Sequence, residues 1–203
     1  MKGLYAFKPW YTRRFAGIVD FAVLHGISPD VFTASGMAAA AVAGVFVALG
    51  WWPLALVFLA LRLAGANLDG AVARTRNVAR PWGFVLNEIG DRASDVVVFA
   101  GLAVWAARQS GPELRWLSWP VFWVLAAALA ATLPTFASLT AAAAGATRGN
   151  GGPLGKTERC LAVVVATALP VTIPYVSAVI IVGSGVTAAA RLGSARREMG
   201  GQH

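Results

Sequence analysis

The sequence predicts an all-α integral membrane protein in which six transmembrane helices follow an N-terminal amphipathic interfacial helix. Hydrophobic residues make up 58% of the 203 residues and charged residues only 13%, whereas a soluble domain carries roughly a quarter charged residues. A helix that crosses the bilayer needs about 20 apolar residues, so six crossings use most of the chain. We therefore expect a single membrane domain over residues 1–203.

The first predicted element is an amphipathic helix over residues 9–25. Phe15, Ile18, Val19 and Ala22 recur at helical spacing, and charged or small residues occupy the other side. This pattern is typical of a helix that lies in the membrane interface.

Six apolar runs follow this helix and form the predicted spans. They cover residues 31–50, 54–68, 83–107, 120–144, 159–170 and 174–191. The first follows a Ser28-Pro29-Asp30 helix start signal and contains no charged residue, and the second is interrupted only by Arg62. The third is polar in its first half and apolar in its second half.

Proline residues divide the later spans. Pro120 stands where the first turn of a helix tolerates proline, and Pro134 predicts a kink inside the fourth span. The apolar stretch after residue 159 is too long for one crossing, and Pro170 and Pro174 bracket a turn near its middle. This stretch is therefore divided into a short fifth span and a sixth span.

Lysine and arginine residues are distributed unevenly between the predicted loops. Thirteen lie before the first span or after the second, fourth and sixth, and only Arg108 and Arg115 lie on the other side. Because cytoplasmic loops are enriched in basic residues, both termini and the segment Asp69–Trp82 are expected in the cytoplasm. The net charge of +8 then reflects orientation and contact with an anionic lipid bilayer, and nucleic acid is not an expected partner.

Ionisable residues inside the predicted spans gather at one place. Asp69 ends the second span, and Asn87, Glu88, Asp91 and Asp95 lie on one stripe of the third, at about 100° per residue. Charged residues in membrane segments are costly and commonly mark a functional site. Oxygen ligands without sulfur or histidine favour Mg²⁺, Mn²⁺ or Ca²⁺ over zinc. The sequence therefore predicts a divalent-cation site between these two spans.

Arginine residues follow this acid cluster along the chain. Arg74, Arg76 and Arg80 come after the second span, close to the small residues Gly70 and Ala73. Arginine matches the geometry of phosphate well, and acids that hold a metal beside such arginines are typical of chemistry at a phosphorus centre. Arg74 is the expected phosphate contact, whereas Arg76 and Arg80 could equally contact lipid headgroups.

The segment Asp69-Gly70-Ala71-Val72-Ala73-Arg74, followed after eight residues by Gly83 and eight residues later by Asp91, resembles the motif of the CDP-alcohol phosphotransferases. The resemblance implies a membrane enzyme of phospholipid biosynthesis. Such an enzyme transfers a phosphatidyl or similar phospho-group from a CDP-linked lipid donor, such as CDP-diacylglycerol, to an alcohol acceptor and releases CMP. It also implies Mg²⁺ or Mn²⁺ as cofactor and a homodimer.

By this resemblance, each motif position has a role. Asp69 and Asp91 are metal ligands, and Asp91 is also the general base for the acceptor hydroxyl. The residues expected at the donor are Gly70, Ala73, Arg74 and Gly83. The chain departs from the family pattern at Ala66 and Asn87, which stand where the family has aspartates.

These departures suggest a modified metal site. Helix geometry places Glu88 and Asp95 where they could partly replace the missing carboxylates, beside Asn87. Arg62 lies two turns before Asp69, and we expect it to neutralise the acid cluster or to hold a donor phosphate, which would leave one tightly bound metal. Arg92 is expected to be a structural partner.

Two basic residues follow the fourth span. Lys156 and Arg159 either bind a phosphate on the acceptor or anchor the fifth span.

Two other functions remain open for this sequence. Ala66 and Asn87 raise the alternative of a catalytically impaired relative that binds a nucleotide lipid or stabilises a partner. A small transporter is less favoured, because the polar stripe occupies only one half of the spans. The sequence does not name the acceptor.

Overall fold

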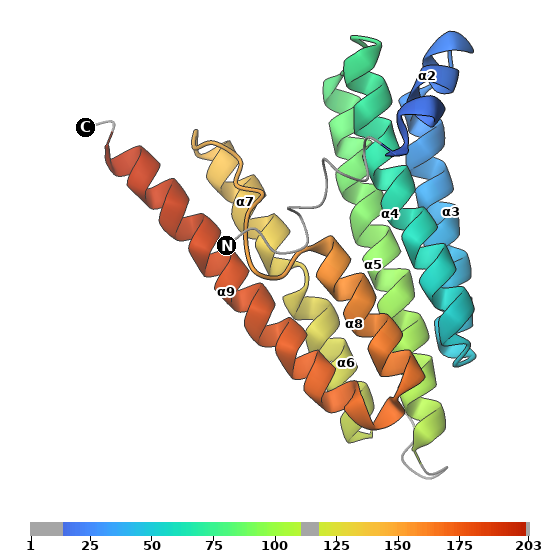
Figure 1. The fold of residues 1–203 in the computed structure, drawn as a ribbon. Coiled ribbons are helices and arrows are strands. Elements are labelled where there is room, and N and C mark those ends of the chain that lie inside the picture. Colours follow the sequence, from blue (N-terminus) through green and yellow to red (C-terminus); the bar gives the residue numbers. More distant parts are fainter. Residues whose placement is uncertain (1–13, 111–117, 202–203) are drawn as a thin grey trace. The chain divides into compact units, whose positions relative to one another are not determined.

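The computed structural model describes residues 14–110 and 118–201, and all regular structure within these ranges is helical (Figure 1). The elements are α2 (Ala16–Leu24), α3 (Pro29–Ala48), α4 (Trp52–Thr75), α5 (Pro81–Gln109), α6 (Trp119–Ala130), α7 (Leu133–Ala143), α8 (Lys156–Ala168), the short 3₁₀ helix η3 (Pro170–Thr172) and α9 (Ile173–Gly200). The predicted all-α class is confirmed.

The helices fall into two compact units that divide within α5, between Trp105 and Ala106. The first unit holds α2, α3, α4 and most of α5. The second holds the end of α5 together with α6, α7, α8 and α9, in which α6 and α7 pack along α9. The single membrane domain over the whole chain stays a prediction.

The starts of α3 and α4 follow from local sequence. The Ser28 hydroxyl accepts a hydrogen bond from the Asp30 amide at 3.3 Å, and Pro29 occupies the first position of α3, where a missing N–H costs nothing. Gly50, with φ of 75°, makes the left-handed turn between α3 and α4. Ser28-Pro29-Asp30 is therefore the helix start that the sequence indicates.

Helix α4 extends further than the sequence predicts. The predicted span ends at Leu68, whereas α4 continues to Thr75. No proline interrupts this segment, and the chain leaves the helical conformation at Asn77, whose φ is 53°. The extension places Asp69 and Arg74 on the same helix.

The predicted proline boundaries agree with the structure. The fourth span is interrupted at residues 131–132, because Pro134 has no N–H to donate to the carbonyl of Ala130. Helix α8 ends at Ala168, and η3 and α9 begin at Pro170 and Ile173, as the division of the last apolar stretch predicts. Helix α9 then continues past the predicted end at residue 191 to Gly200.

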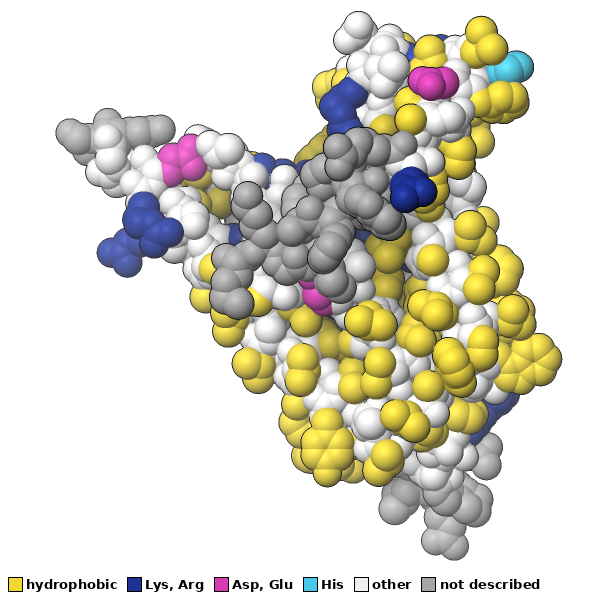
Figure 2. Space-filling model, viewed as in Figure 1, with side chains coloured by type: hydrophobic (Ala, Val, Ile, Leu, Met, Phe, Trp, Pro, Cys, Tyr) yellow, Lys and Arg dark blue, Asp and Glu magenta, His cyan; other side chains and the backbone are white. Residues whose placement is uncertain are grey.

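Four segments of the described chain are long and apolar enough to cross a membrane: Pro29–Ala48, Trp52–Thr75, Trp119–Ala143 and Pro170–Gly200. Along α3 and α4, large hydrophobic side chains such as Val45, Leu56 and Leu61 are exposed, and Figure 2 shows this apolar surface. These segments match four of the six predicted spans. Crossing by α5 and by α8 stays a prediction.

Helix α2 packs on α4 beside the segment that carries Asp69. Val19 and Ala22 are buried against Leu68, Ala71 and Val72 of α4, and the partly buried Phe15 packs against the same cluster. Ile18, which the sequence places on the apolar face, is instead 44% exposed. Residues 9–13 of the predicted amphipathic helix lie outside the described residues.

Glycine residues bring α3 into backbone contact with both of its neighbours. A Cβ added at Gly65 of α4 would lie 2.7 Å from the carbonyl oxygen of Phe32, and one at Gly101 of α5 would lie 2.2 Å from that of Gly44. Only glycine allows helices to approach so closely. As a result, polar side chains from three helices can meet.

Candidate functional site

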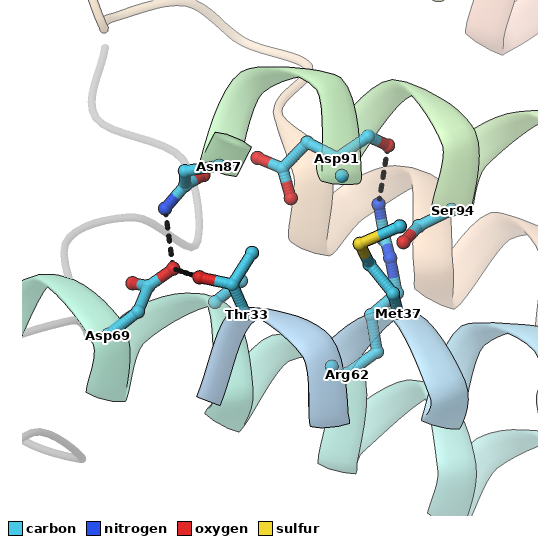
Figure 3. Close-up of a pocket in the computed structure, with 10 residues that line it drawn as sticks. Thr33, Met37, Arg62, Asp69, Asn87, Asp91 and Ser94 are labelled. Atoms are coloured by element: carbon cyan, nitrogen blue, oxygen red, sulfur yellow. Dashed lines mark hydrogen bonds between the residues drawn. The ribbon is translucent and has the colours of Figure 1, made fainter. Parts of the chain in front are cut away.

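The three helices α3, α4 and α5 line an open pocket of about 220 Å³, a volume that includes space open to solvent (Figure 3). Its lining consists of Thr33, Gly36 and Met37 from α3, Arg62, Ala66 and Asp69 from α4, and Asn87, Gly90, Asp91 and Ser94 from α5. The lining residues of each helix recur every three or four positions, so each helix presents one face to the pocket. All of them lie in the first compact unit.

Asp69 is the most constrained acid of the pocket. Its side chain is buried, with 5% of its surface exposed. One carboxylate oxygen, Oδ2, accepts hydrogen bonds from the Thr33 hydroxyl at 2.9 Å and from the Asn87 amide at 2.6 Å. The other, Oδ1, accepts one from the Gly70 backbone N–H at 2.5 Å. Donors on three helices therefore hold this carboxylate in one orientation.

Asp91 lies one helical turn after Asn87, on the wall opposite Asp69. Its carboxylate points into the space between α5 and the helices α3 and α4 (Figure 3). Ala66, one turn before Asp69 on α4, adds no polar atom to the same space. The pocket thus presents two facing carboxylates and one amide.

A partly buried group of charges, formed by Arg62, Asp95 and Arg92, adjoins the pocket. Arg62 Nη2 donates to Asp95 Oδ1 at 2.7 Å and to the backbone carbonyl of Asp91 at 3.3 Å. The second oxygen of Asp95 lies 3.1 Å from Arg92 Nη1. Arg62 therefore neutralises an acid of this cluster, and Arg92 pairs with the same acid. The expected contact of Arg62 with a donor phosphate stays a prediction. Asp95 lies outside the pocket lining, and its role as a metal ligand stays a prediction that this pairing does not favour.

The remaining residues predicted at the donor or the metal lie near the pocket but outside its lining. Arg74 is exposed, and its Nη1 would be 3.1 Å from a Cβ at Gly70, so the guanidinium lies over that glycine. Ala73, Gly83 and Glu88 are half-buried. Their proposed contacts with donor or metal stay predictions.

Arg76 and Arg80 stabilise the segment after α4. Arg76 donates to the backbone carbonyl of Ile27 at 2.7 Å, and Arg80 forms an ion pair with Asp30 at the start of α3. Both arginines thus join this segment to the turn that precedes α3, a role that the sequence did not indicate.

Lys156 and Arg159, the residues predicted at the acceptor, belong to the second compact unit. Lys156 is the first residue of α8, whose first turn is capped by Glu158, which accepts a hydrogen bond from the Gly155 amide at 3.0 Å. Arg159 is buried, with 5% of its surface exposed. The structure brings these two residues together on one helix turn.

The loop before α8 is fixed by an arginine that the sequence analysis did not single out. Arg191 of α9 donates to the carbonyls of Gly151 at 2.8 Å and Pro134 at 2.7 Å, and to the Ser138 hydroxyl at 2.9 Å. Ser138 itself donates to the carbonyl of Gly149 at 2.7 Å. The Arg191 guanidinium thus joins the loop before α8 to α7 and α9.

Thr33, Met37 and Ser94 are pocket residues that sequence reasoning did not assign to the site. Thr33 lies three residues after Asp30 of the Ser28-Pro29-Asp30 helix start, and this position was a usable signal. Met37 and Ser94 have no comparable signal, because a methionine or serine in a membrane helix most often serves packing.

The donor set of the pocket fits one hard divalent cation. In the described ranges, no three histidine, cysteine or acidic side chains converge as a metal site. Two carboxylates and an amide, all oxygen ligands, suit Mg²⁺ or Mn²⁺, which retain several waters or take substrate phosphates as further ligands. Asp69, Asp91 and Asn87 are the residues available for this purpose.

Known proteins are similar to this chain in sequence and in structure over most of its length. The chain is 29% identical over 202 residues to the phosphatidylinositol phosphate synthase of Mycolicibacterium smegmatis, covering 94% of this chain and 87% of the relative. The crystal structure of Mycobacterium tuberculosis phosphatidylinositol phosphate synthase with CDP-DAG bound matches with a TM-score of 0.74 at 26% identity, covering 90% of this chain and 94% of that one.

The same Mycobacterium tuberculosis protein in complex with manganese and citrate matches with a TM-score of 0.72 at 25% identity, covering 88% and 87% of the two chains. The family model described as CDP-alcohol phosphatidyltransferase matches residues 26–190. This range contains α3, α4 and α5 and therefore the whole pocket. The chain is an integral membrane protein and belongs to the CDP-alcohol phosphatidyltransferase family.

Proposed function

We propose that this enzyme, a CDP-alcohol phosphotransferase, transfers the phosphatidyl group of CDP-diacylglycerol to an alcohol acceptor and releases CMP in phospholipid biosynthesis. The observation that carries the proposal is the pocket in which Asp69 and Asp91 face each other from α4 and α5. The motif that surrounds them and the length and apolar character of α3 and α4 support access of a lipid-linked donor to this pocket.

The reaction is a displacement at phosphorus. The acceptor oxygen forms a bond to the phosphorus of the phosphatidyl group, and the bond between that phosphorus and the oxygen of CMP breaks. Asp91 takes the proton of the acceptor hydroxyl, since its carboxylate points into the pocket. Asp69 is held by Thr33, Asn87 and Gly70 and keeps its position throughout.

The cofactor is Mg²⁺ or Mn²⁺, and Asp69, Asp91 and Asn87 would hold it. When bound, a divalent ion would neutralise the negative charge on the pyrophosphate of the donor. Arg74 and the small residues Gly70, Ala73 and Gly83 contact the donor from the end of α4 and the start of α5.

The orientation in the membrane, the acceptor site and the oligomeric state are further parts of this proposal. Both termini and the pocket face the cytoplasm, which the distribution of basic residues supports. Lys156 and Arg159 bind the acceptor, and the protein acts as a homodimer in the bilayer. The similar proteins named phosphatidylinositol phosphate synthase make an inositol phosphate the first acceptor to assay.

The proposal is tested by measuring CMP release from CDP-diacylglycerol by the purified protein, with Mg²⁺ or Mn²⁺, over a panel of alcohol and phosphorylated alcohol acceptors. We expect release that requires both a metal and one particular acceptor, and a lipid product that carries this acceptor. Binding of CDP-diacylglycerol without CMP release from any acceptor would contradict the proposed transfer.

Thr33→Val is expected to lower activity by about tenfold, because it removes one charge-assisted hydrogen bond to Asp69 while preserving the side-chain shape. The change should appear in kcat and in the concentration of metal needed for half-maximal rate. Ser35→Ala is the matched control, since Ser35 is exposed on the same helix and donates only to the Phe32 carbonyl. Wild-type kinetics of Thr33→Val would show that Asp69 keeps its orientation without the Thr33 hydroxyl.

Lys156→Ala is expected to raise the KM for a phosphate-bearing acceptor by about tenfold, through loss of a charged contact, and to leave the KM for CDP-diacylglycerol unchanged. Initial rates measured against each substrate in turn separate the two constants. An unchanged acceptor KM would assign Lys156 to anchoring of α8.

A further inference from the structure

The group formed by Arg62, Asp95 and Arg92 is more than a helix contact, because it places charge inside the protein beside the pocket. Arg62 has 2% of its surface exposed and Asp95 has 8%. The Arg92 side chain is 26% exposed. Two guanidinium groups and one carboxylate give these three residues one net positive charge, and the burial of Arg62 and Asp95 reduces the screening of their charges by water.

The positive charge reaches the pocket through Arg62. Arg62 is itself a lining residue, and the same nitrogen that binds Asp95 also donates to the backbone carbonyl of Asp91 (Figure 3). Asp95 fixes Arg62 in this position from the following turn of α5. A permanent cation is thus built into the pocket wall, in contact with the backbone of Asp91.

The acids that face the pocket carry negative charge, opposite in sign to the net charge of the Arg62–Asp95–Arg92 group. Asp69 and Asp91 contribute two negative charges, whereas Ala66 and Asn87, which line the same space, contribute none. One divalent cation therefore balances the two facing carboxylates. A second would add two positive charges next to Arg62, and the pocket lining has no third carboxylate to receive it.

We propose that the Arg62–Asp95–Arg92 group restricts the pocket to a single divalent cation, held by Asp69 and Asp91, and that Arg62 supplies a fixed positive charge in the pocket wall. The proposal rests on the proposed function only in taking the pocket as the metal site. It assigns Arg62 and Asp95 as electrostatic positioning residues and excludes Asp95 from the metal ligands.

The first measurement counts metal ions without turnover. Detergent-purified wild-type protein is freed of metal with a chelator and titrated with Mn²⁺, and bound and free ions are separated by the electron paramagnetic resonance signal of free Mn²⁺. We expect one tight Mn²⁺ per chain with the spectrum of an isolated ion. Two tight Mn²⁺ per chain, or an exchange-coupled pair, would overturn the proposal, and so would the absence of tight binding.

The second measurement uses the sign of a charge change at residues that are not ligands. Arg92→Gln makes the group neutral and is expected to tighten Mn²⁺ binding by about tenfold, whereas Asp95→Asn makes it doubly positive and is expected to weaken binding by a similar factor. Arg92→Lys retains the charge and is the matched control, with unchanged affinity. A purely structural role would weaken binding in both charge-changing variants, and that result would overturn the proposal.

The outcomes separate this inference from the proposed function. One Mn²⁺ per chain, with affinity shifts of opposite sign in Arg92→Gln and Asp95→Asn, supports the inference even if no acceptor yields CMP. CMP release accompanied by two tight Mn²⁺ ions overturns the inference and leaves the function intact. Elution as a single species in detergent shows that each variant is folded, and the wild-type ion count decides the question if a variant is not.

Discussion

Asp91→Asn is expected to reduce CMP release by about 10³-fold, within the range lost with a general base. Asparagine has nearly the same shape as aspartate, so the fold should be retained, but its amide cannot take the proton from the acceptor hydroxyl. The substitution also removes one of the two carboxylates that face the pocket, so Mn²⁺ affinity should fall as well. Rates of CMP release at saturating Mn²⁺ separate loss of the base from loss of metal binding.

The matched control for this prediction is Asp20→Asn. Asp20 is an exposed acid on α2 and lies outside the pocket, so the same chemical change there should leave the rate unchanged. If Asp91→Asn retained activity within threefold of wild type at saturating metal, another group would have to take the proton, and Asp91 would be a metal ligand only.

The helices of this protein could be predicted closely because the bilayer requires long apolar runs. Proline then marks the divisions of those runs, as Pro134 and Pro170 do. The end of α4 could not be predicted in the same way, since the apolar run ends at Leu68 but the backbone remains helical to Thr75. The extent of an apolar run indicates which part of a helix can contact lipid. The residue at which the helix ends depends on local backbone preference.

The acidic half of the site could be predicted because charge is rare and costly in membrane helices. Asp69, Asn87 and Asp91 do meet in one pocket. Which acids pair with arginines depends on how α4 and α5 are rotated against each other. The sequence therefore allowed Arg62 and Arg92 to pair with Asp69, Asp91 or Asp95, but it did not select Asp95 from these three acids.

The contribution of α3 was the least predictable part of the site. This helix is an uncharged apolar run in which many small residues could face a neighbour, so periodicity alone does not select Thr33 or Met37. Their position follows from the close approach of Gly36 to Gly65 and of Gly44 to Gly101. Backbone contacts between helices, which single-sequence patterns do not encode, thus determine which hydroxyl reaches Asp69.

Gly101→Ala is accordingly expected to be the most destabilising single-methyl change among the described glycines of the first unit. The added Cβ would lie 2.2 Å from the carbonyl oxygen of Gly44 and 3.1 Å from its Cα. Both atoms belong to the backbone, so no side-chain rotation relieves the contact and α3 and α5 must separate. Overpacking of a core typically costs 1–3 kcal/mol, and here we expect about 3 kcal/mol or more, which lowers the Tm by roughly 6–12 °C.

Thermal unfolding of the detergent-purified protein measures this change, with Gly185→Ala as the matched control. Gly185 lies within α9, and a Cβ there would have no atom within 4 Å, so the control should keep the wild-type Tm or raise it slightly through higher helix propensity. Because α3 carries Thr33 and α5 carries Asn87 and Asp91, separation of the two helices should also lengthen the hydrogen bonds to Asp69. Gly101→Ala should therefore weaken Mn²⁺ binding below its Tm. An unchanged Tm with wild-type Mn²⁺ affinity would mean that α3 and α5 are not held in backbone contact, and that the orientation of Asp69 does not depend on it.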